Sequence, residues 1–75
     1  SLTKTEFLIL EYFMKNKGLS CSREKIIVGV WGYDFDGEEK IVDVYINSLR
    51  KKIDPKSYYI HTVRGFGYIF QYKED

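Results

Sequence analysis

The amino-acid sequence predicts a small α+β domain in which three helices precede a C-terminal β-hairpin. Apolar residues recur at helical spacing in three segments before the single proline, Pro55. After that proline, short runs of β-branched and aromatic residues flank a turn that contains two glycines. A chain of 75 residues holds one domain at most. We expect helices over about residues 3–17, 22–31 and 39–53, and the hairpin over about residues 59–71.

The first predicted helix opens with the sequence of a capping box, in which Thr3 and Glu6 each accept a hydrogen bond from the other's amide. Gly18 supplies a left-handed stop. Four apolar residues recur at helical spacing: Phe7, Leu10, Phe13 and Met14. Three more cover much of the remaining circumference: Leu8, Ile9 and Tyr12. A helix that is apolar nearly all round is normally covered on two sides, so we expect a covering layer outside this chain. Scattered surface apolar side chains are the alternative.

The second helix follows a short extended piece at residues 19–21. Ser22 is a good N-cap, and Glu24 in the first turn suits the helix dipole. The apolar stripe of this helix consists of Ile26, Ile27, Val30 and Trp31. Gly29 weakens a helix interior by about 1 kcal/mol relative to alanine, so we expect close packing there. Residues 32–39, GYDFDGEE, form an acidic loop.

The third helix has acidic residues at its start and three basic residues in its last turn, which suits the helix dipole. Pro55 ends it, because the residue before a proline avoids helical dihedral angles. One apolar stripe contains Val42, Ile46, Leu49 and Ile53, with Tyr45 beside it. The opposite arc contains Lys40, Ile41, Val44, Asn47, Ser48 and Lys51. Two β-branched apolar residues on an outward polar face suit contact with thymine methyl groups in a major groove.

The hairpin consists of strands over residues 59–63 and 68–71 and a turn over residues 64–67. Gly65 and Gly67 permit positive φ angles in that turn. An arginine at the start of such a turn reaches outward, which makes Arg64 a candidate for contact with a ligand.

Charge is unevenly distributed along the chain. The net charge is only +1, but residues 40–64 carry six basic and two acidic side chains, a local balance of +4. The rest of the chain therefore carries −3. A basic half of this kind favours a polyanion such as nucleic acid as the partner. A charged face that meets only water is the alternative.

The sequence contains no persuasive active site, so we expect no enzyme, no cofactor and no metal. His61 is the only histidine and Cys21 the only cysteine, too few for a metal site. One cysteine cannot form an internal disulfide, which favours the reducing cytoplasm. No apolar run approaches the roughly 20 residues that a membrane-spanning helix needs, so we expect no membrane partner.

Four motifs in order resemble the C-terminal effector domain of OmpR/PhoB-family bacterial response regulators, and the resemblance covers essentially all 75 residues. The first helix carries Leu2-Thr3 with Glu6-Phe7 and Leu10; the second carries Ser22-Arg23-Glu24 and Val30-Trp31-Gly32. The third carries Val42-Asp43-Val44, Ile46 and Leu49-Arg50-Lys51-Lys52-Ile53. The hairpin carries TVRGFGYIF. Each motif is weak alone, but four at the right spacing are highly specific.

The resemblance implies a winged helix-turn-helix fold whose N-terminal four-stranded sheet is missing here, as is the phosphorylated receiver domain. It also implies that the third helix enters a major groove and that Arg64 probes the adjacent minor groove. Combined with the outward arc, it gives these expected DNA-binding residues: Lys40, Ile41, Val44, Tyr45, Asn47, Ser48, Arg50, Lys51, Lys52, Thr62 and Arg64. Ser48 stands where many relatives carry a basic residue, and serine discriminates poorly between bases.

The acidic loop matches the segment that some relatives use to contact RNA polymerase, which suggests four candidate residues: Tyr33, Asp34, Asp36 and Glu38. A solvated loop without a partner is the alternative for this segment. We expect sequence-specific binding of double-stranded DNA for transcription regulation, as the output domain of a two-component response regulator. The isolated fragment is expected to be a monomer, and with its receiver domain a tandem dimer on DNA. The rival hypothesis is a winged-helix protein-interaction module anchored by Ile41 and Val44; RNA binding is a weaker option.

Overall fold

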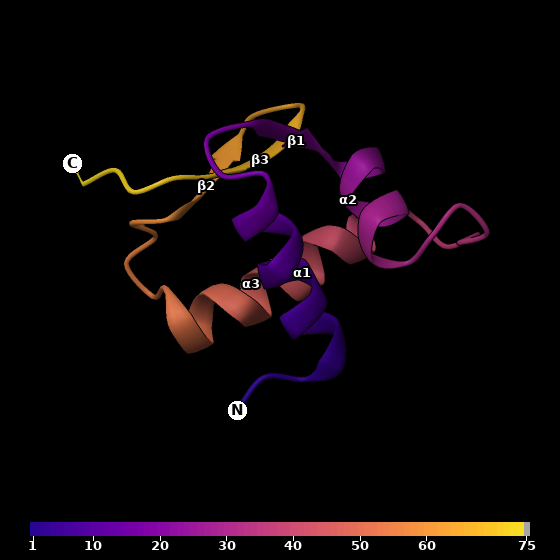
Figure 1. Cartoon of the computed structure of the whole chain (residues 1–75), viewed down its shortest axis with the longest axis horizontal. Helices are drawn as coiled ribbons and strands as arrows, with labels where there is room; N and C mark the ends of the chain where they lie inside the picture. The colour runs from indigo at the N-terminus through magenta and orange to yellow at the C-terminus, as the bar shows by residue number, and fades with distance from the viewer. Residues whose placement is uncertain (75) are drawn as a thin grey trace.

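The computed structural model describes residues 1–74, and in it three helices pack beside a small antiparallel sheet (Figure 1). The elements in chain order are α1 (Lys4–Lys15), β1 (Ser20–Ser22), α2 (Arg23–Val30), α3 (Lys40–Ile53), β2 (Ile60–Val63) and β3 (Gly67–Phe70). In the view of Figure 1, α1 crosses in front of α3, and the loop after α2 projects to the right. Each helix is slightly shorter than the segment expected from its sequence.

Local capping explains where the first two helices begin. The Thr3 amide donates to Glu6 Oε1 at 2.8 Å, and the Glu6 amide donates to Thr3 Oγ1 at 3.1 Å, which confirms the capping box. Ser22 Oγ accepts from the Lys25 amide at 3.1 Å, as expected of an N-cap. Both caps satisfy amide groups that a helix start leaves without intrahelical partners.

The end of α3 is bound to the start of the sheet by a buried carboxylate. Asp54, only 5% exposed, accepts hydrogen bonds from the amides of Tyr58, Tyr59 and Ile60 at 2.9 to 3.1 Å. Ser57 between them has a φ of 55° and lies in the left-handed region. The side chain thus fixes the direction in which the chain leaves α3 and enters β2.

The sheet has one more strand than the predicted hairpin. Its order is β1-β3-β2, and β1 pairs with β3 in the register Ser20↔Ile69, Cys21↔Tyr68 and Ser22↔Gly67. Gly65 has the expected positive φ, 74°, but Gly67 does not. A Cβ atom on Gly67 would lie 2.1 Å from the Cys21 carbonyl oxygen, so the missing side chain allows β1 to approach β3.

The core lies between the three helices and the sheet. Its fully buried side chains are Ile9, Phe13, Ile26, Val42, Ile46, Leu49 and Ile60. Close packing at Gly29 is confirmed, because a Cβ atom there would lie 2.3 Å from Cε1 of Tyr12. The expected buried stripe of α3 is confirmed except for Ile53, which is 43% exposed.

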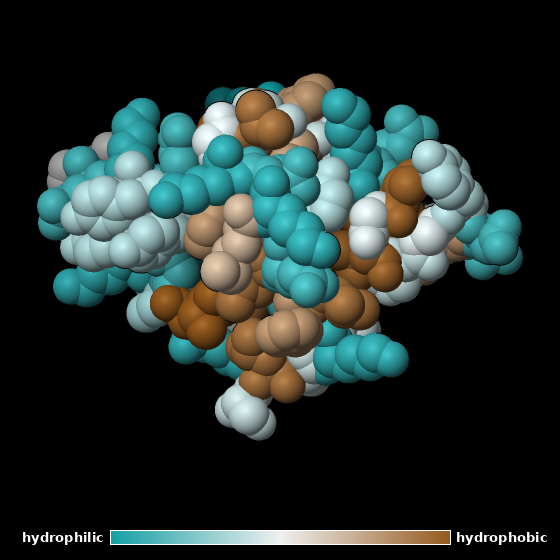
Figure 2. All heavy atoms as spheres, in the orientation of Figure 1, coloured by the Kyte–Doolittle hydropathy of each residue, from teal (hydrophilic) through white to brown (hydrophobic). Residues whose placement is uncertain are grey.

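The two apolar faces expected for α1 are corrected by the structure. Ile9 is fully buried in this domain's own core, whereas Phe7 is 54% and Met14 62% exposed. The reason is that Glu6, Ile9 and Phe13 form the stripe that faces α3 and the sheet. Apolar side chains gather on the viewer's face of the molecule over α1 (Figure 2). The outward apolar surface of α1 therefore contains Phe7, Leu10 and Met14, whereas Ile9 belongs to the core and Tyr12 packs against it.

Candidate nucleic-acid interface

One stripe of α3 faces away from the core and is exposed along its whole length. It consists of Lys40, Val44, Asn47 and Lys51, which recur at the three- and four-residue spacing of one helix face. Val44 is 63% exposed. Lys40 makes an exposed ion pair with Glu38 at 3.3 Å, whereas Asn47 and Lys51 have no side-chain hydrogen bond within residues 1–74. We call these four residues the outward stripe.

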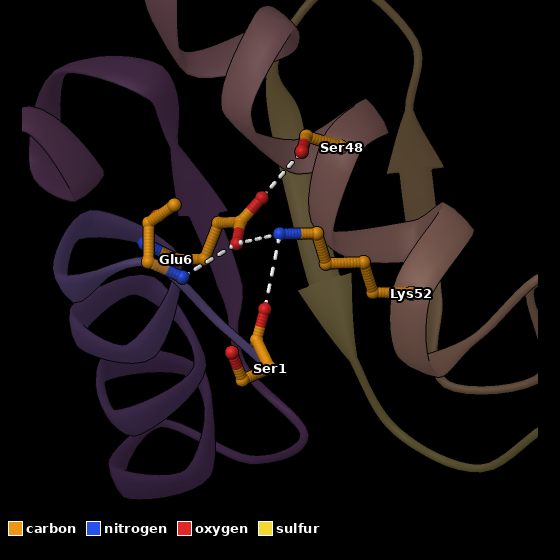
Figure 3. A network of polar contacts seen from close by, with 5 residues as sticks. Ser1, Glu6, Ser48 and Lys52 are labelled. Carbon is orange, nitrogen blue, oxygen red and sulfur yellow. Dashed lines mark hydrogen bonds and ion pairs between the residues drawn. The ribbon is translucent and has the colours of Figure 1, made fainter.

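Ser48 does not belong to the outward stripe, which corrects the arc expected from the sequence, and Lys52, an expected DNA contact outside that arc, lies on the same flank as Ser48. Ser48 Oγ donates to Glu6 Oε2, and Lys52 Nζ donates to Glu6 Oε1 at 2.8 Å and to the Ser1 carbonyl at 3.2 Å (Figure 3). Both residues lie on the flank of α3 that meets α1, where a buried carboxylate requires partners. Their hydrogen-bonding groups are thereby directed away from the outward stripe.

Glu6 is charged at neutral pH despite being only 1% exposed. The hydrogen bond from Lys52 is the main cause, and those from Ser48 and the Thr3 amide add to it; together they lower the pKa of Glu6 from 4.5 to about 2. The Glu6 carboxylate thus connects the start of α1 with the last two turns of α3. This connection fixes one flank of α3 against α1.

Arg50 connects the other flank of α3 to the hairpin. Its Nε and Nη2 donate to the Ile60 carbonyl at 3.2 and 3.0 Å, and Nη2 also donates to Thr62 Oγ1 at 3.0 Å. The Arg50 guanidinium therefore links α3 to the hairpin, and the N–H groups that make these bonds are not available to a ligand. Thr62 remains exposed, and its hydroxyl hydrogen is still available to a partner such as a phosphate.

A second cluster of contacts joins α2, α3 and β3. Asp43 Oδ1 accepts from Arg23 Nε at 3.0 Å and from the buried Tyr68 hydroxyl. The guanidinium carbons of Arg23 and Arg50 lie 5.4 and 5.3 Å from the centre of the Tyr68 ring, so two cations contact one aromatic side chain. Burial, followed by the hydrogen bond to Asp43, raises the pKa of Tyr68.

Arg64 lies at the exposed tip of the hairpin. It precedes Gly65 in the turn between β2 and β3, and the Phe66 amide closes that turn on the Val63 carbonyl at 2.9 Å. Within residues 1–74, no hydrogen bond or ion pair engages the Arg64 side chain. Because Arg50 binds β2 to α3, the hairpin that presents Arg64 is held beside α3.

The remaining expected contacts lie at the edges of this surface. Ile41 and Tyr45 are half-buried, and the Tyr45 ring packs against Trp31 with ring centres 5.7 Å apart. The four candidate residues of the acidic loop are all exposed, and Tyr33 is 89% exposed. That loop is attached to α2 by the contact between Trp31 and Phe35, whose ring centres lie 5.4 Å apart. The loop candidates are Tyr33, Asp34, Asp36 and Glu38.

His61 and Cys21 have structural surroundings. His61 Nε2 lies 2.9 Å from the Tyr58 carbonyl and 3.1 Å from the Gln71 carbonyl, in a strand of the sheet. Cys21 is buried, and burial raises the pKa of its thiol. The described residues hold no cluster of three or more potential metal ligands. None of the helices in residues 1–74 combines the length and the apolar character required to cross a bilayer.

The domain is a winged helix-turn-helix. It has three helices, a hairpin wing that is hydrogen-bonded to α3, and an exposed stripe with basic residues. The family described as "Transcriptional regulatory protein, C terminal" matches residues 1–70, and the chain belongs to this family. It is a family of transcription regulators and not of enzymes.

Named relatives support this assignment. The chain is 50% identical over 72 residues to the transcriptional regulatory protein TrcR of Mycobacterium tuberculosis, covering 95% of this chain and 28% of TrcR. It is 49% identical over 70 residues to the response regulator ArlR of Staphylococcus saprophyticus, covering 91% of this chain and 32% of ArlR. The chain thus spans less than a third of the curated relatives it matches.

A solved structure of a related domain bound to its target shares the fold. The Klebsiella pneumoniae RstA DNA-binding domain, determined in complex with the RstA box, superimposes with a TM-score of 0.82 at 32% identity. The match covers 95% of this chain and 73% of that one. The expected resemblance to the effector domains of response regulators is therefore confirmed.

The sequence did not reveal the internal partners of the polar residues on α3. Glu6 and Ser48 lie 42 residues apart, and Glu6 and Lys52 lie 46 apart. The one signal was the position of Glu6 on the same helix face as Ile9 and Phe13, because a carboxylate on a buried stripe requires partners.

Proposed function

We propose that this domain binds double-stranded DNA in a sequence-specific manner and regulates transcription, with α3 in a major groove and the hairpin in the adjacent minor groove. The observation that carries the proposal is the link from Arg50 to Ile60 and Thr62, which holds the hairpin beside α3. A major groove about 12 Å wide admits one helix. A helix and a wing held side by side suit two neighbouring grooves.

The roles within this surface follow from charge and exposure. Asn47 and Lys51 of the outward stripe lie near base edges, and Lys40 and Thr62 contact phosphates. Arg64 enters the minor groove, where a narrow A·T-rich segment concentrates negative potential. Arg50 acts chiefly as a support for the wing, since Nε and Nη2 are already engaged. The engaged groups of Ser48 and Lys52 exclude them from our set of DNA contacts.

We propose further that the domain is the output unit of a longer two-component response regulator that binds tandem half-sites as a dimer. The relatives are about three times as long as this chain, and ArlR is a response regulator. Because its proposed partner is DNA, we expect the protein to act in the bacterial cytoplasm. The exposed acidic loop around Tyr33 and Asp34 is our candidate for contact with RNA polymerase.

A salt titration of binding to random duplex DNA tests the central proposal. Affinity that falls steeply with salt supports release of counterions from phosphates. Replacing the exposed Lys51 by alanine should reduce the slope of log K against log salt by about 1. Lys17→Ala, an equally exposed change beyond α1, is the matched control and should leave the slope unchanged. A flat salt response would favour the protein-interaction module instead.

A further inference from the structure

The hydrogen bonds on α3 sort its polar side chains into engaged and free groups. Asp43 is engaged by Arg23 and Tyr68, and Arg50 by Ile60 and Thr62. Ser48 and Lys52 are engaged by Glu6 (Figure 3). Three polar side chains remain on the outward stripe: Asn47 and Lys51, which have no side-chain partner within residues 1–74, and Lys40, which pairs only with the exposed Glu38. The two lysines are single cations, so Asn47 alone offers both a donor and an acceptor.

The chemistry of that amide selects one base. Adenine presents N7 as an acceptor and N6 as a donor in the major groove, and an asparagine side chain pairs with both at once. Guanine presents two acceptors there and leaves the asparagine carbonyl without a partner. Within the described residues Asn47 has no internal hydrogen bond, so no existing contact has to break first.

Val44 supplies an apolar neighbour on the same stripe. It precedes Asn47 by three residues and is 63% exposed, so its methyl groups face outward one helical turn before the amide. Three residues of helix rise about 4.5 Å along the axis. Successive base pairs are separated by about 3.4 Å, so both side chains can reach neighbouring pairs. A valine methyl in a major groove favours the C5-methyl of thymine.

We infer that α3 reads an adjacent adenine and thymine, the adenine through Asn47 and the thymine methyl through Val44, and that Ser48 takes no part in base choice. This inference rests on the proposed function and adds the base preference of the site. It places an A·T-containing step within each half-site. The minor-groove preference proposed for Arg64 lies beside this step and is independent of it.

Selection from a random duplex library tests the inference, using the whole chain. The wild-type protein should enrich half-sites with an adjacent adenine and thymine. In Asn47→Ala, the preference for adenine over other bases at that position should fall by roughly 5- to 150-fold, and the preferences at other positions should remain. Ser48→Ala is the matched control, because its hydroxyl faces Glu6; it should enrich the same half-sites as the wild-type protein.

Single-atom changes in the selected DNA separate the two contacts. Replacing the thymine by deoxyuridine removes only the methyl group; this should weaken binding by the wild-type protein and leave Val44→Ala unaffected. Replacing the adenine by 7-deazaadenine removes the N7 acceptor and should weaken the wild-type protein but not Asn47→Ala. Each variant changes an exposed side chain of the outward stripe, and circular dichroism checks that each remains folded.

The possible failures can be told apart. A half-site core of G·C pairs, or an enriched motif that Asn47→Ala does not alter, would overturn the inference and leave DNA binding intact. A preference for guanine that disappears in Lys51→Ala would show that the lysine reads the base. That result would also overturn the inference. Absence of salt-dependent binding to any duplex would overturn the proposed function itself.

Discussion

The guanidinium of Arg50 in α3 and the carbonyl oxygen of Ile60 in β2 are joined by two hydrogen bonds, from Nε at 3.2 Å and from Nη2 at 3.0 Å. Because Ile60 is fully buried and begins the wing, this pair makes the hairpin and the helix one unit. A basic residue that the sequence marks as a DNA contact thus serves first to hold the wing.

Arg50→Lys should destabilise the domain although the charge is retained. A lysine offers one ammonium group and cannot reproduce the forked contact with Ile60 and Thr62. Hydrogen bonds from charged groups are worth about 1.5–3 kcal/mol each, so we expect a loss of about 1–3 kcal/mol in the free energy of unfolding. Urea denaturation measures it, with Lys51→Arg on the outward stripe as the control. An unchanged midpoint for Arg50→Lys would show that the link is dispensable.

Arg64→Ala should weaken DNA binding mainly at sites with A·T-rich flanks. The exposed Arg64 guanidinium is attracted to the potential of a narrow minor groove, which A·T-rich segments provide. We expect a loss of roughly 1–3 kcal/mol on A·T-rich flanks and a smaller loss on G·C-rich flanks. Binding isotherms on two duplexes that differ only in their flanks make the comparison. Equal losses on both would argue against a minor-groove role.

Lowering the pH should remove the stabilisation that Glu6 provides. The pKa of Glu6 is about 2 in the folded domain, below its ordinary value of 4.5, so the unfolded chain binds the proton more tightly. The contribution of this carboxylate is therefore complete above about pH 4.5 and is lost as the pH falls from there towards about 2. Urea midpoints at about pH 6 and about pH 3 measure the loss.

Glu6→Gln should be less stable than the wild-type protein at about pH 6 and should lose less stability on acidification. Glu11→Gln, at an exposed position of α1, is the matched control and should retain the wild-type dependence. If Glu6→Gln and the wild-type protein lost the same stability between the two pH values, another carboxylate would be responsible.

Gly67→Ala should disrupt the sheet more than Gly65→Ala. A Cβ atom on Gly67 would lie 2.1 Å from the Cys21 carbonyl and 2.9 Å from the Ser22 Cα, so β1 and β3 would have to separate. A Cβ atom on Gly65 meets nothing within 4 Å, and its cost is the left-handed conformation, about 1–2 kcal/mol. Amide exchange in β1 distinguishes the two variants, because only Gly67→Ala should expose its amides. Equal protection in both would contradict this account.

Local interactions made much of the fold predictable. The capping box of Thr3 and Glu6 spans three residues, and the buried stripe of Val42, Ile46 and Leu49 repeats within one helix. Such signals are complete within one or two helical turns, so they can be read without knowing the rest of the chain. The extended piece before α2 was expected, but its pairing with β3 was missed, because Ser20–Ser22 have little apolar character and pair with a segment more than forty positions away.

The sequence by itself determined the three helices, the wing and the resemblance that leads to a family of transcription regulators, because periodicity, caps and turn glycines act over short distances. Only the tertiary structure decided which polar side chains of α3 are free. Ser48 and Lys52 are drawn to Glu6, and Arg50 to Ile60, because a buried carboxylate and a buried carbonyl require hydrogen-bond partners wherever the fold brings them. The polar side chains of α3 that face outward for a ligand are those without a buried hydrogen-bond partner.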